Sequence, residues 1–211
     1  MEEKMKVCAV IGAAPITDGS VFKGINDGDY VICADGGMDS ALKYGIKPDL
    51  IVGDFDSAES DVPKGTETIR LKTEKDDTDM LAAVMEGLRR GYRNFILFGA
   101  LGGLRFDHSF ANLCVLQYLN KNGCKAIILD EKCRVFLIND GRLILSKVKG
   151  KTVSVYPFGC QSCTVSYIGL KYPLTRAVLT SDNPRGTSNI IISDVAQITV
   201  HIGNALIIVE K

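Results

Sequence analysis

Strand-like and helix-like segments alternate along the amino-terminal part of the chain, and this alternation restricts the fold more than any other feature. Apolar, β-branched runs predict strands at residues 6–11, 30–34, 49–52, 68–71, 94–98, 126–129 and 135–138. Helical spacing of apolar residues predicts helices at 38–44, 78–90 and 107–120. This order favours an α/β domain with a doubly wound, mainly parallel sheet and helices on both faces.

The pattern changes near residues 139–141. Beyond that point only strands are predicted, separated by short turns, at residues 143–147, 152–156, 163–168, 177–180, 189–192, 196–202 and 205–209. Closely spaced strands without helices favour a β-sandwich or a related antiparallel unit. We therefore predict two domains, an α/β domain at 1–140 and a β-sandwich domain at 141–211.

Composition excludes several classes of protein. Lys plus Arg and Asp plus Glu are 25 each, so no net field favours nucleic acid or an anionic membrane. No apolar run reaches the ~18 residues of a membrane span, and the charged start does not resemble a signal peptide. The seven cysteines are scattered, and Cys160 and Cys163 lack a second pair or a nearby His, which argues against a zinc site. Free thiols predict a cytoplasmic protein.

Polar residues follow several of the predicted strands directly. Asp35 follows the second strand, Asp54 follows the third, and a glycine-rich loop with Arg105 and Asp107 follows the fifth. Ligands of open α/β sheets bind beyond the carboxyl ends of the strands. The sequence therefore predicts a ligand site at this edge of the sheet.

The third strand leads into Gly-Asp-Phe-Asp-Ser, with Asp54 and Asp56 two residues apart. In extended backbone such residues point the same way, and two neighbouring carboxylates repel each other. Mg²⁺ removes that conflict because it takes carboxylate oxygens together with phosphate oxygens. Gly53 allows close approach of a ligand to the backbone.

A second acidic group surrounds Thr78 at the start of the predicted helix at 78–90. Asp76, Asp77 and Asp79 could join the same metal and phosphate site. The alternative is ordinary helix capping, because Asp and Thr both favour helix starts.

The glycine-rich loop at residues 99–104 matches neither the P-loop pattern nor the dinucleotide-binding pattern. Its backbone N–H groups could still bind phosphate, and Arg105 suits paired phosphate oxygens. A plain surface turn is the alternative. His108 and Asn112 are four residues apart and share a helix face, which places both beside the loop.

Several short motifs occur together in one order. They are Ala-Asp-Gly-Gly from Ala34, Pro-Asp from Pro48, Gly-Asp-Phe-Asp-Ser from Gly53, Asp-Asp-Thr-Asp from Asp76, Arg-Phe-Asp-His from Arg105, Val-Ser-Val-Tyr-Pro from Val153, Gly-Leu-Lys-Tyr-Pro-Leu from Gly169 and Gly-Thr-Ser-Asn from Gly186. In this order they resemble the thiamine pyrophosphokinases of the bacterial type, over nearly the whole chain.

The resemblance implies an α/β nucleotide-binding catalytic domain, a thiamine-binding β-sandwich and a homodimer with active sites at the subunit interface. It implies transfer of the pyrophosphoryl group of ATP to thiamine, giving thiamine diphosphate and AMP, with Mg²⁺. The implied catalytic residues are Asp54, Asp56, Asp76 and Asp79, and the metal ligands are Asp35, Asp54, Asp56 and Asp79. The implied nucleotide contacts are Gly36, Gly53, Ser57, Thr78, Gly102, Gly103, Arg105 and Asn112. The implied substrate contacts are Asp107, His108, Ser188 and Asn189, the last two acting across the dimer.

One departure and two alternatives accompany the resemblance. Family members usually read Gly-Gly-Arg, whereas Leu104 here separates Gly103 from Arg105 and can shift the arginine relative to the loop. The aromatic residues Tyr156, Phe158, Tyr167 and Tyr172 could stack on a cationic substrate, with core packing as the alternative for at least two of them. The alternative functions are a pyrophosphokinase for another alcohol, such as a hydroxymethylpterin, and a non-catalytic nucleotide or thiamine sensor.

Overall fold

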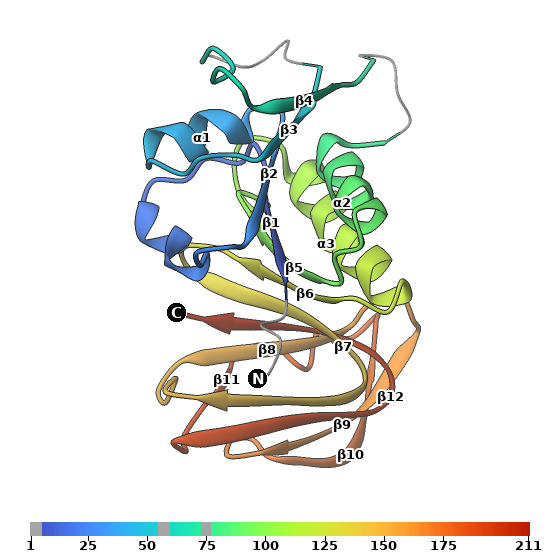
Figure 1. Ribbon diagram of the computed structural model, residues 1–211. Helices are drawn as coiled ribbons and strands as arrows, with labels where there is room; N and C mark the ends of the chain where they lie inside the picture. The colour runs from blue at the N-terminus through green and yellow to red at the C-terminus, as the bar shows by residue number, and fades with distance from the viewer. Residues whose placement is uncertain (1–5, 55–59, 73–76) are drawn as a thin grey trace, which may run out of the picture. The chain divides into compact units, whose positions relative to one another are not determined.

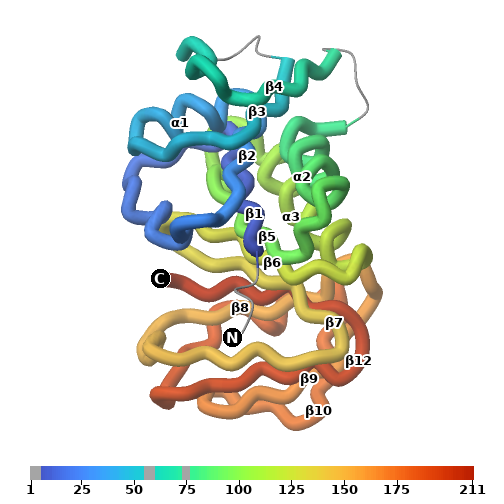
Figure 2. The backbone as a smooth tube through the Cα atoms, viewed as in Figure 1, coloured from blue at the N-terminus to red at the C-terminus, as the bar shows by residue number. Residues whose placement is uncertain are grey.

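A computed structural model describes residues 6–54, 60–72 and 77–211. The chain forms two compact units, Met1–Glu131 and Lys132–Lys211. Figures 1 and 2 show the helices in the first unit and the long strands in the second. The boundary predicted at residue 140 lies inside strand β7 (Cys133–Ser146), because the Asn-Asp-Gly turn signal falls within a continuous strand.

The first unit contains a parallel sheet of order β6-β5-β1-β2-β3-β4. Its strands are β1 (Val7–Ile11), β2 (Tyr30–Ala34), β3 (Leu50–Gly53), β4 (Glu67–Arg70), β5 (Asn94–Phe98) and β6 (Lys125–Leu129). The inner strands β1, β2 and β3 are almost wholly buried, as apolar runs of this kind require when helices cover both faces of a parallel sheet.

Helices cover both faces of this sheet, as the alternating pattern predicts. Figure 1 shows α1 (Gly37–Lys43) on one face and α2 (Asp79–Arg89) and α3 (Phe106–Lys121) on the other. Alternate residues of β1 therefore enter different cores: Ile11 packs in the cluster that contains Met38 of α1, whereas Cys8 lies against α2 at Gly87. A short 3₁₀ helix, η1 (Gly19–Gly24), was not predicted, because it is too short to show helical periodicity.

The second unit is antiparallel throughout. Its strands are β7, β8 (Thr152–Pro157), β9 (Ser162–Ile168), β10 (Leu174–Thr180), β11 (Asn189–Ile190) and β12 (Val195–Glu210). One half of β12 pairs with β9 and the other half with β8, while β7 pairs along both halves. A strand that changes sheets in this way forms a corner of a sandwich, so the predicted fold class is confirmed.

Two pairs of predicted strands are single strands in the structure. Residues 135–138 and 143–147 belong to β7, and residues 196–202 and 205–209 belong to β12. The two turn signals lie opposite each other, since Gly141 pairs with Val200 and Asn139 with Asn204. A register shift between β7 and β12 accommodates both turn signals at this point, where Asp140 and Gly203 have φ values of 38° and 85°. The prediction of four separate strands was therefore wrong.

Candidate active site

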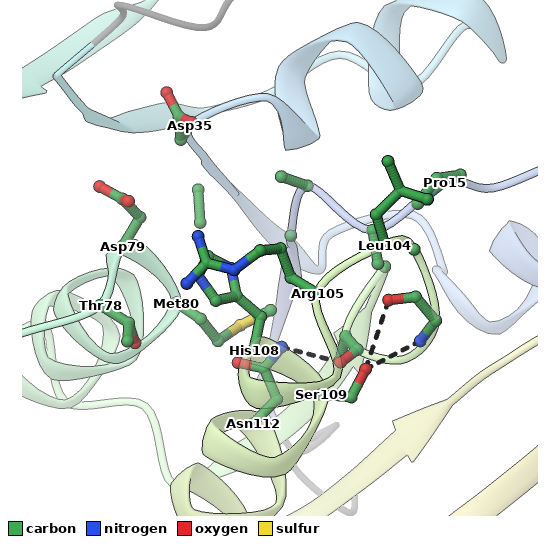
Figure 3. Close-up of a pocket in the computed structure, with 18 residues that line it drawn as sticks. Pro15, Asp35, Thr78, Asp79, Met80, Leu104, Arg105, His108, Ser109 and Asn112 are labelled. Atoms are coloured by element: carbon green, nitrogen blue, oxygen red, sulfur yellow. Dashed lines mark hydrogen bonds between the residues drawn. The ribbon is translucent and has the colours of Figure 1, made fainter.

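A cavity of about 500 Å³ lies in the first unit, beyond the carboxyl ends of the parallel strands (Figure 3). Its walls come from the segments that follow β1, β2 and β5 and from the starts of α2 and α3. The lining residues are Gly12, Ala13, Ala14, Pro15, Ala34, Asp35, Thr78, Asp79, Met80, Gly99, Ala100, Gly102, Gly103, Leu104, Arg105, His108, Ser109 and Asn112.

Two glycines bring the loops after β1 and β5 into backbone contact. The Gly12 N–H donates to the Phe98 carbonyl at 2.8 Å, and the Ala14 N–H donates to the Gly99 carbonyl at 3.0 Å. A Cβ atom on Gly12 would lie 2.7 Å from the Gly99 oxygen, and Gly99 has φ 54°. Only glycine fits both positions, and the cavity wall here is mainly backbone.

The glycine turn before α3 is held by two side chains of that helix. The Ser109 hydroxyl accepts from the Gly102 N–H at 3.0 Å. Asn112, which is 8% exposed, donates from Nδ2 to the Ala100 carbonyl at 2.8 Å. Asn112 thus fixes the loop that lines the cavity, whether or not it also contacts a nucleotide. Gly102 and Gly103 have φ 89° and 76°, which a residue with a Cβ adopts only under strain.

Arg105 and Asp107 form an ion pair at the rim. The distances are 3.0 Å from Nε to Oδ1 and 2.5 Å from Nη2 to Oδ2, and the side chains are 66% and 62% exposed. The Arg105 guanidinium lowers the pKa of Asp107 to about 2. Leu104, the inserted residue, is fully exposed, and Arg105 still lines the cavity despite the insertion. Arg105 and His108, at the start of α3, both line the cavity (Figure 3).

Three of the four predicted metal ligands, Asp35, Asp54 and Asp79, are described, and each lies at the end or start of a different element. Asp35 follows β2 with φ 46° and donates its N–H to the Val52 carbonyl at 2.9 Å. Asp79 begins α2, and Figure 3 shows it on the same side of the cavity as Asp35. Asp54 follows β3, where a Cβ on Gly53 would lie 3.0 Å from the Asp35 Cα. The ends of β2 and β3 are therefore adjacent, although the described cavity lining includes Asp35 and Asp79 without Asp54.

Asp56, Ser57 and Asp76 lie outside the described residues, so the predicted carboxylate group is visible only in part. Within residues 6–54, 60–72 and 77–211, no three His, Cys, Asp or Glu side chains are grouped so as to hold a metal ion. The magnesium site remains a prediction.

Thr78 has the capping role that was the alternative to ligand binding. It precedes α2, and its hydroxyl accepts from the Leu81 N–H at 3.2 Å. Thr78 also lines the cavity, so the capping role places a hydroxyl at the cavity wall.

A second groove of about 480 Å³ runs between α2 and α3 and shares Thr78 with the first cavity. Its wall is mostly apolar, with Asp77 and Asp107 as acidic members. The lining residues are Asp77, Thr78, Leu81, Asp107, Phe110, Ala111, Cys114, Val115 and Tyr118. The Arg105–Asp107 ion pair therefore joins a residue of the first cavity to a residue of this groove.

The remaining predicted site residues are not among those that line the cavity. Gly36 is the N-cap of α1. In the second unit, Asn189 is 8% exposed and its amide binds the Tyr172 backbone, accepting from N–H at 3.0 Å and donating to the carbonyl at 2.8 Å. Ser188, at φ 56°, donates its N–H to the Ser154 hydroxyl at 3.0 Å. Asn189 thus fixes the position of Tyr172.

The aromatic residues of the second unit divide between core and surface. Tyr167 is 4% exposed and belongs to the hydrophobic core, and burial raises its pKa. Tyr172 is 59% exposed, with the Lys171 ammonium 5.5 Å from its ring centroid. Of these two, Tyr172 is the ring that a ligand can reach.

The loop after β1 was missed as a site element. Residues 12–15 line the cavity, as do Met80 and Ser109, and none was predicted. The signal was present for the loop, because Gly12 ends the first strand just as Asp35 ends the second. The rule that ligands bind beyond strand ends applies to both.

The fold and the cavity place the chain among α/β proteins whose ligand cavity lies beyond the ends of a parallel sheet, here followed by an antiparallel β unit. Comparison with known families narrows this class. The family model for the thiamin pyrophosphokinase catalytic domain matches residues 23–128, and that for the thiamin pyrophosphokinase vitamin B1 binding domain matches residues 142–207. The chain belongs to the thiamin pyrophosphokinase family, which confirms the resemblance of its motifs.

Individual relatives agree with this assignment. The chain is 29% identical to thiamine pyrophosphokinase 3 of Oryza sativa subsp. japonica, over 93% of this chain and 74% of the relative. It is 30% identical to thiamine pyrophosphokinase 2 of the same plant, over 89% and 71%. A crystal structure of thiamine pyrophosphokinase from Bacillus subtilis has the same fold, with a TM-score of 0.87, 22% identity and coverage of 98% and 99%. Among the helices of the described residues, none is both long and apolar enough to span a membrane.

Proposed function

We propose that the chain transfers the pyrophosphoryl group of ATP to the hydroxyl of thiamine, releasing AMP and thiamine diphosphate. The observation that carries this proposal is the match of a catalytic and a vitamin B1 binding family model to successive parts of the chain. The relatives named thiamine pyrophosphokinase, which align with most of the chain, support it further.

The cavity beyond the strand ends is the proposed nucleotide site. Its volume of about 500 Å³ is in the range of cofactor pockets. Its backbone-lined wall offers N–H donors at the glycine turn, and Arg105 supplies a planar cation suited to phosphate oxygens. Thr78, Gly102, Gly103 and Asn112 border this space, whereas Gly36 and Gly53 would act by holding the ends of β2 and β3.

The donor set fits Mg²⁺, which prefers carboxylate oxygens. Asp35 and Asp79 border the cavity, and Asp54 follows a strand whose end lies against Asp35. We propose these three residues as ligands, together with Asp56, and Asp76 as a neighbouring catalytic carboxylate. When bound, Mg²⁺ would offset the negative charge of the triphosphate.

The proposed transfer requires the protein mainly to position the two substrates and to compensate the negative charge of the phosphates. The thiamine hydroxyl oxygen attacks the β-phosphorus, the bond from that phosphorus to the α-phosphate oxygen breaks, and AMP leaves. The hydroxyl loses its proton in the process. Arg105 would hold phosphate oxygens, and the N–H groups of the glycine turn would stabilise charge on the departing and transferred groups. We assign no general base.

Asp107, His108, Ser188 and Asn189 are proposed as contacts of thiamine, as the motif resemblance implies. Asp107 offers a carboxylate to a cationic ligand, and Tyr172 offers an exposed ring for stacking. Asn189 would act by fixing the Tyr172 backbone, with Ser188 beside it. Ser188 and Asn189 are proposed to act across a homodimer.

An exposed apolar face of the second unit supports the homodimer. Ile144 and Ile168 both lie opposite Gln197, so they share a sheet face, and Val195 lies two residues away on that face. The three apolar side chains are 59%, 63% and 59% exposed. Contiguous exposed apolar side chains are typical of association surfaces. Sedimentation of the wild type and of Ile168→Asp tests this, since a monomeric wild type contradicts the proposal.

A cytoplasmic location is also proposed. All seven cysteines are free, and four of them, Cys8, Cys33, Cys124 and Cys163, are buried thiols whose pKa is raised by burial. Thiols that are used for packing suit a reducing compartment. Localisation of a tagged chain in its own cells tests this.

Product analysis tests the reaction. Incubation with ATP, Mg²⁺ and thiamine should give AMP and thiamine diphosphate in equal amounts by mass spectrometry. Replacement of thiamine by a hydroxymethylpterin should give no AMP, because that alcohol lacks the thiazolium cation. ADP as the product would indicate a different kinase, and thiamine binding without turnover would indicate a sensor.

A further inference from the structure

The carboxylate of Glu131 binds three donors on a segment far away in the sequence. It accepts from the Thr17 N–H, from the Thr17 hydroxyl at 2.7 Å and from the Asp18 N–H at 3.0 Å. Glu131 follows β6 and is the last residue of the first unit. These donors lower its pKa, the Asp18 N–H most strongly, so Glu131 is ionised at neutral pH. An ionised carboxylate only accepts hydrogen bonds, which matches a group of donors.

Thr17 and Asp18 lie two and three residues beyond the loop that lines the cavity. Residues 12–15 form part of the cavity wall, and Asp18 then caps η1, accepting from the Ser20 N–H at 2.8 Å. The near end of this loop is fixed by backbone bonds from Gly12 and Ala14 to Phe98 and Gly99. Its far end is fixed by Glu131 and by a hydrogen bond of 3.2 Å from the Tyr44 hydroxyl to the Ile16 carbonyl.

The loop also lies close to the glycine turn before α3. A Cβ on Gly103 would lie only 3.3 Å from the Pro15 Cδ, so the loop and the turn approach each other closely at this point. A shift of the loop would therefore move Pro15 against the turn that carries the proposed phosphate-binding N–H groups. Close packing transmits small displacements in this way.

We propose that Glu131 is a positioning residue for nucleotide binding, which holds residues 12–15 at the cavity wall through Thr17 and Asp18. The inference rests on the proposed nucleotide site. It adds a residue that lies in none of the motifs and that contacts neither the cavity nor any predicted site residue in the bonds described above. Charge-assisted hydrogen bonds hold the loop more firmly than neutral ones.

The test compares Glu131→Gln, Thr17→Val and the double variant with the wild type. Glu131→Gln keeps the size of the side chain but replaces one acceptor oxygen with an NH₂ group, which cannot accept from the Thr17 and Asp18 donors. Thr17→Val removes only the hydroxyl of Thr17. Glu67→Gln is the matched control, because Glu67 also binds several donors, on Arg90, at the amino end of β4. Steady-state kinetics give the KM values for ATP and thiamine, and calorimetry gives the affinity for α,β-methylene-ATP, which cannot transfer the group.

Glu131→Gln should raise the KM for ATP and the Kd for the analogue about tenfold, as expected for loss of charge-assisted bonds. The KM for thiamine at saturating ATP should stay within about twofold of wild type, and Glu67→Gln should leave both KM values unchanged. Glu131→Gln and Thr17→Val should be non-additive, because they remove the same contact.

A purely structural role predicts a different result, namely a lower melting temperature with unchanged analogue affinity at a temperature where the protein is folded. That result, or full additivity of the two variants, would overturn the inference. If the wild type binds the analogue but makes no thiamine diphosphate, the proposed reaction fails while the calorimetry still tests Glu131. If the wild type binds no nucleotide, both proposals fail.

Discussion

The guanidinium of Arg105 donates two hydrogen bonds to the carboxylate of Asp107, one from Nε at 3.0 Å and one from Nη2 at 2.5 Å. Arg105 lines the cavity and Asp107 lines the neighbouring groove. Each charge therefore neutralises the other when neither space holds a ligand. Phosphate oxygens in the cavity would compete for Arg105, which would leave the Asp107 carboxylate for a cationic group.

Replacing Arg105 with Gln should raise the pKa of Asp107 from about 2 toward its ordinary value of 3.8. A depressed carboxylate pKa contributes stability above the unfolded value and loses it as the pH falls through the folded value. The ion pair should therefore make the wild type slightly more stable than Arg105→Gln above pH 4, by a small amount because the pair is exposed. This difference should disappear as the pH falls to about 2 and below. Carbon-13 NMR titration of the carboxyl groups measures the pKa, and an unchanged value in the variant contradicts the ion pair.

Asp54 and Asp49 provide a matched comparison at opposite ends of β3. Asp54→Asn should lower turnover at least about a hundredfold with little loss of stability, because its proposed role is metal binding. Asp49 accepts from the Val31 N–H at 2.8 Å, so Asp49→Asn should keep turnover and cost about 1 kcal/mol of stability. Urea denaturation and steady-state assays separate the two. Near-normal turnover of Asp54→Asn would refute the metal role.

Gly99→Ala should disturb the cavity wall. The added Cβ would meet the Gly12 carbonyl oxygen, and the backbone has φ 54°, so a loss of about 2–4 kcal/mol is expected from strain and displacement together. Gly91→Ala is the control, since φ is 91° but the space is open, and strain alone should cost about 1–2 kcal/mol. Thermal melts measure both losses. Equal losses would show that the contact between the two loops is unimportant.

Arg90 should matter for stability and leave catalysis unchanged. It binds Tyr30, Glu67 and Glu86 near the amino ends of the strands, and Arg89, followed by Arg90, lowers the pKa of Glu86 to about 2. Arg90→Met should cost about 1–3 kcal/mol at pH 7. The loss should shrink as the pH falls below 4.5 toward 2, because the depressed pKa of Glu86 contributes only above that range. Urea denaturation at several pH values measures this, and a loss independent of pH would contradict it.

Tyr172→Ala should raise the KM for thiamine about tenfold, because the proposed stacking of the ring on the cation is lost. Tyr172→Phe keeps the ring and should stay within about twofold of wild type. The KM for ATP serves as the internal reference and should not change in either variant. An unchanged KM for thiamine in Tyr172→Ala would remove Tyr172 from the substrate site.

Much of the first unit could be predicted because its inner strands β1, β2 and β3 are buried on both faces and α2 is amphipathic. The apolar run that becomes β1 and the helical spacing in α2 each admit one main interpretation. The second unit was harder, because Asp140-Gly141 and Gly203-Asn204 read as turns. In the structure these two segments lie opposite each other where β7 pairs with β12, and a register shift there lets both strands continue. This arrangement exists only after the two strands have paired, so neither segment shows it alone.

For the site, the motifs indicated which polar side chains take part. Local sequence does not show which of these side chains form hydrogen bonds to other parts of the protein. Thr78 was open between capping and ligand binding, and the structure shows it capping α2 at the cavity wall. Asn112 was predicted as a nucleotide contact, and its amide holds the Ala100 loop. The bonds from Glu131 to Thr17 span most of the first unit in sequence, and only tertiary structure brings such residues together.

The exposed thiol of Cys114 on the groove wall has a practical consequence. Cys8 and Cys33 are buried with pKa values raised to about 12, and such thiols react slowly with alkylating reagents at neutral pH. A maleimide fluorophore should therefore couple first to Cys114, without prior removal of these two cysteines. The attached dye would then report occupancy of the groove during titrations with either substrate.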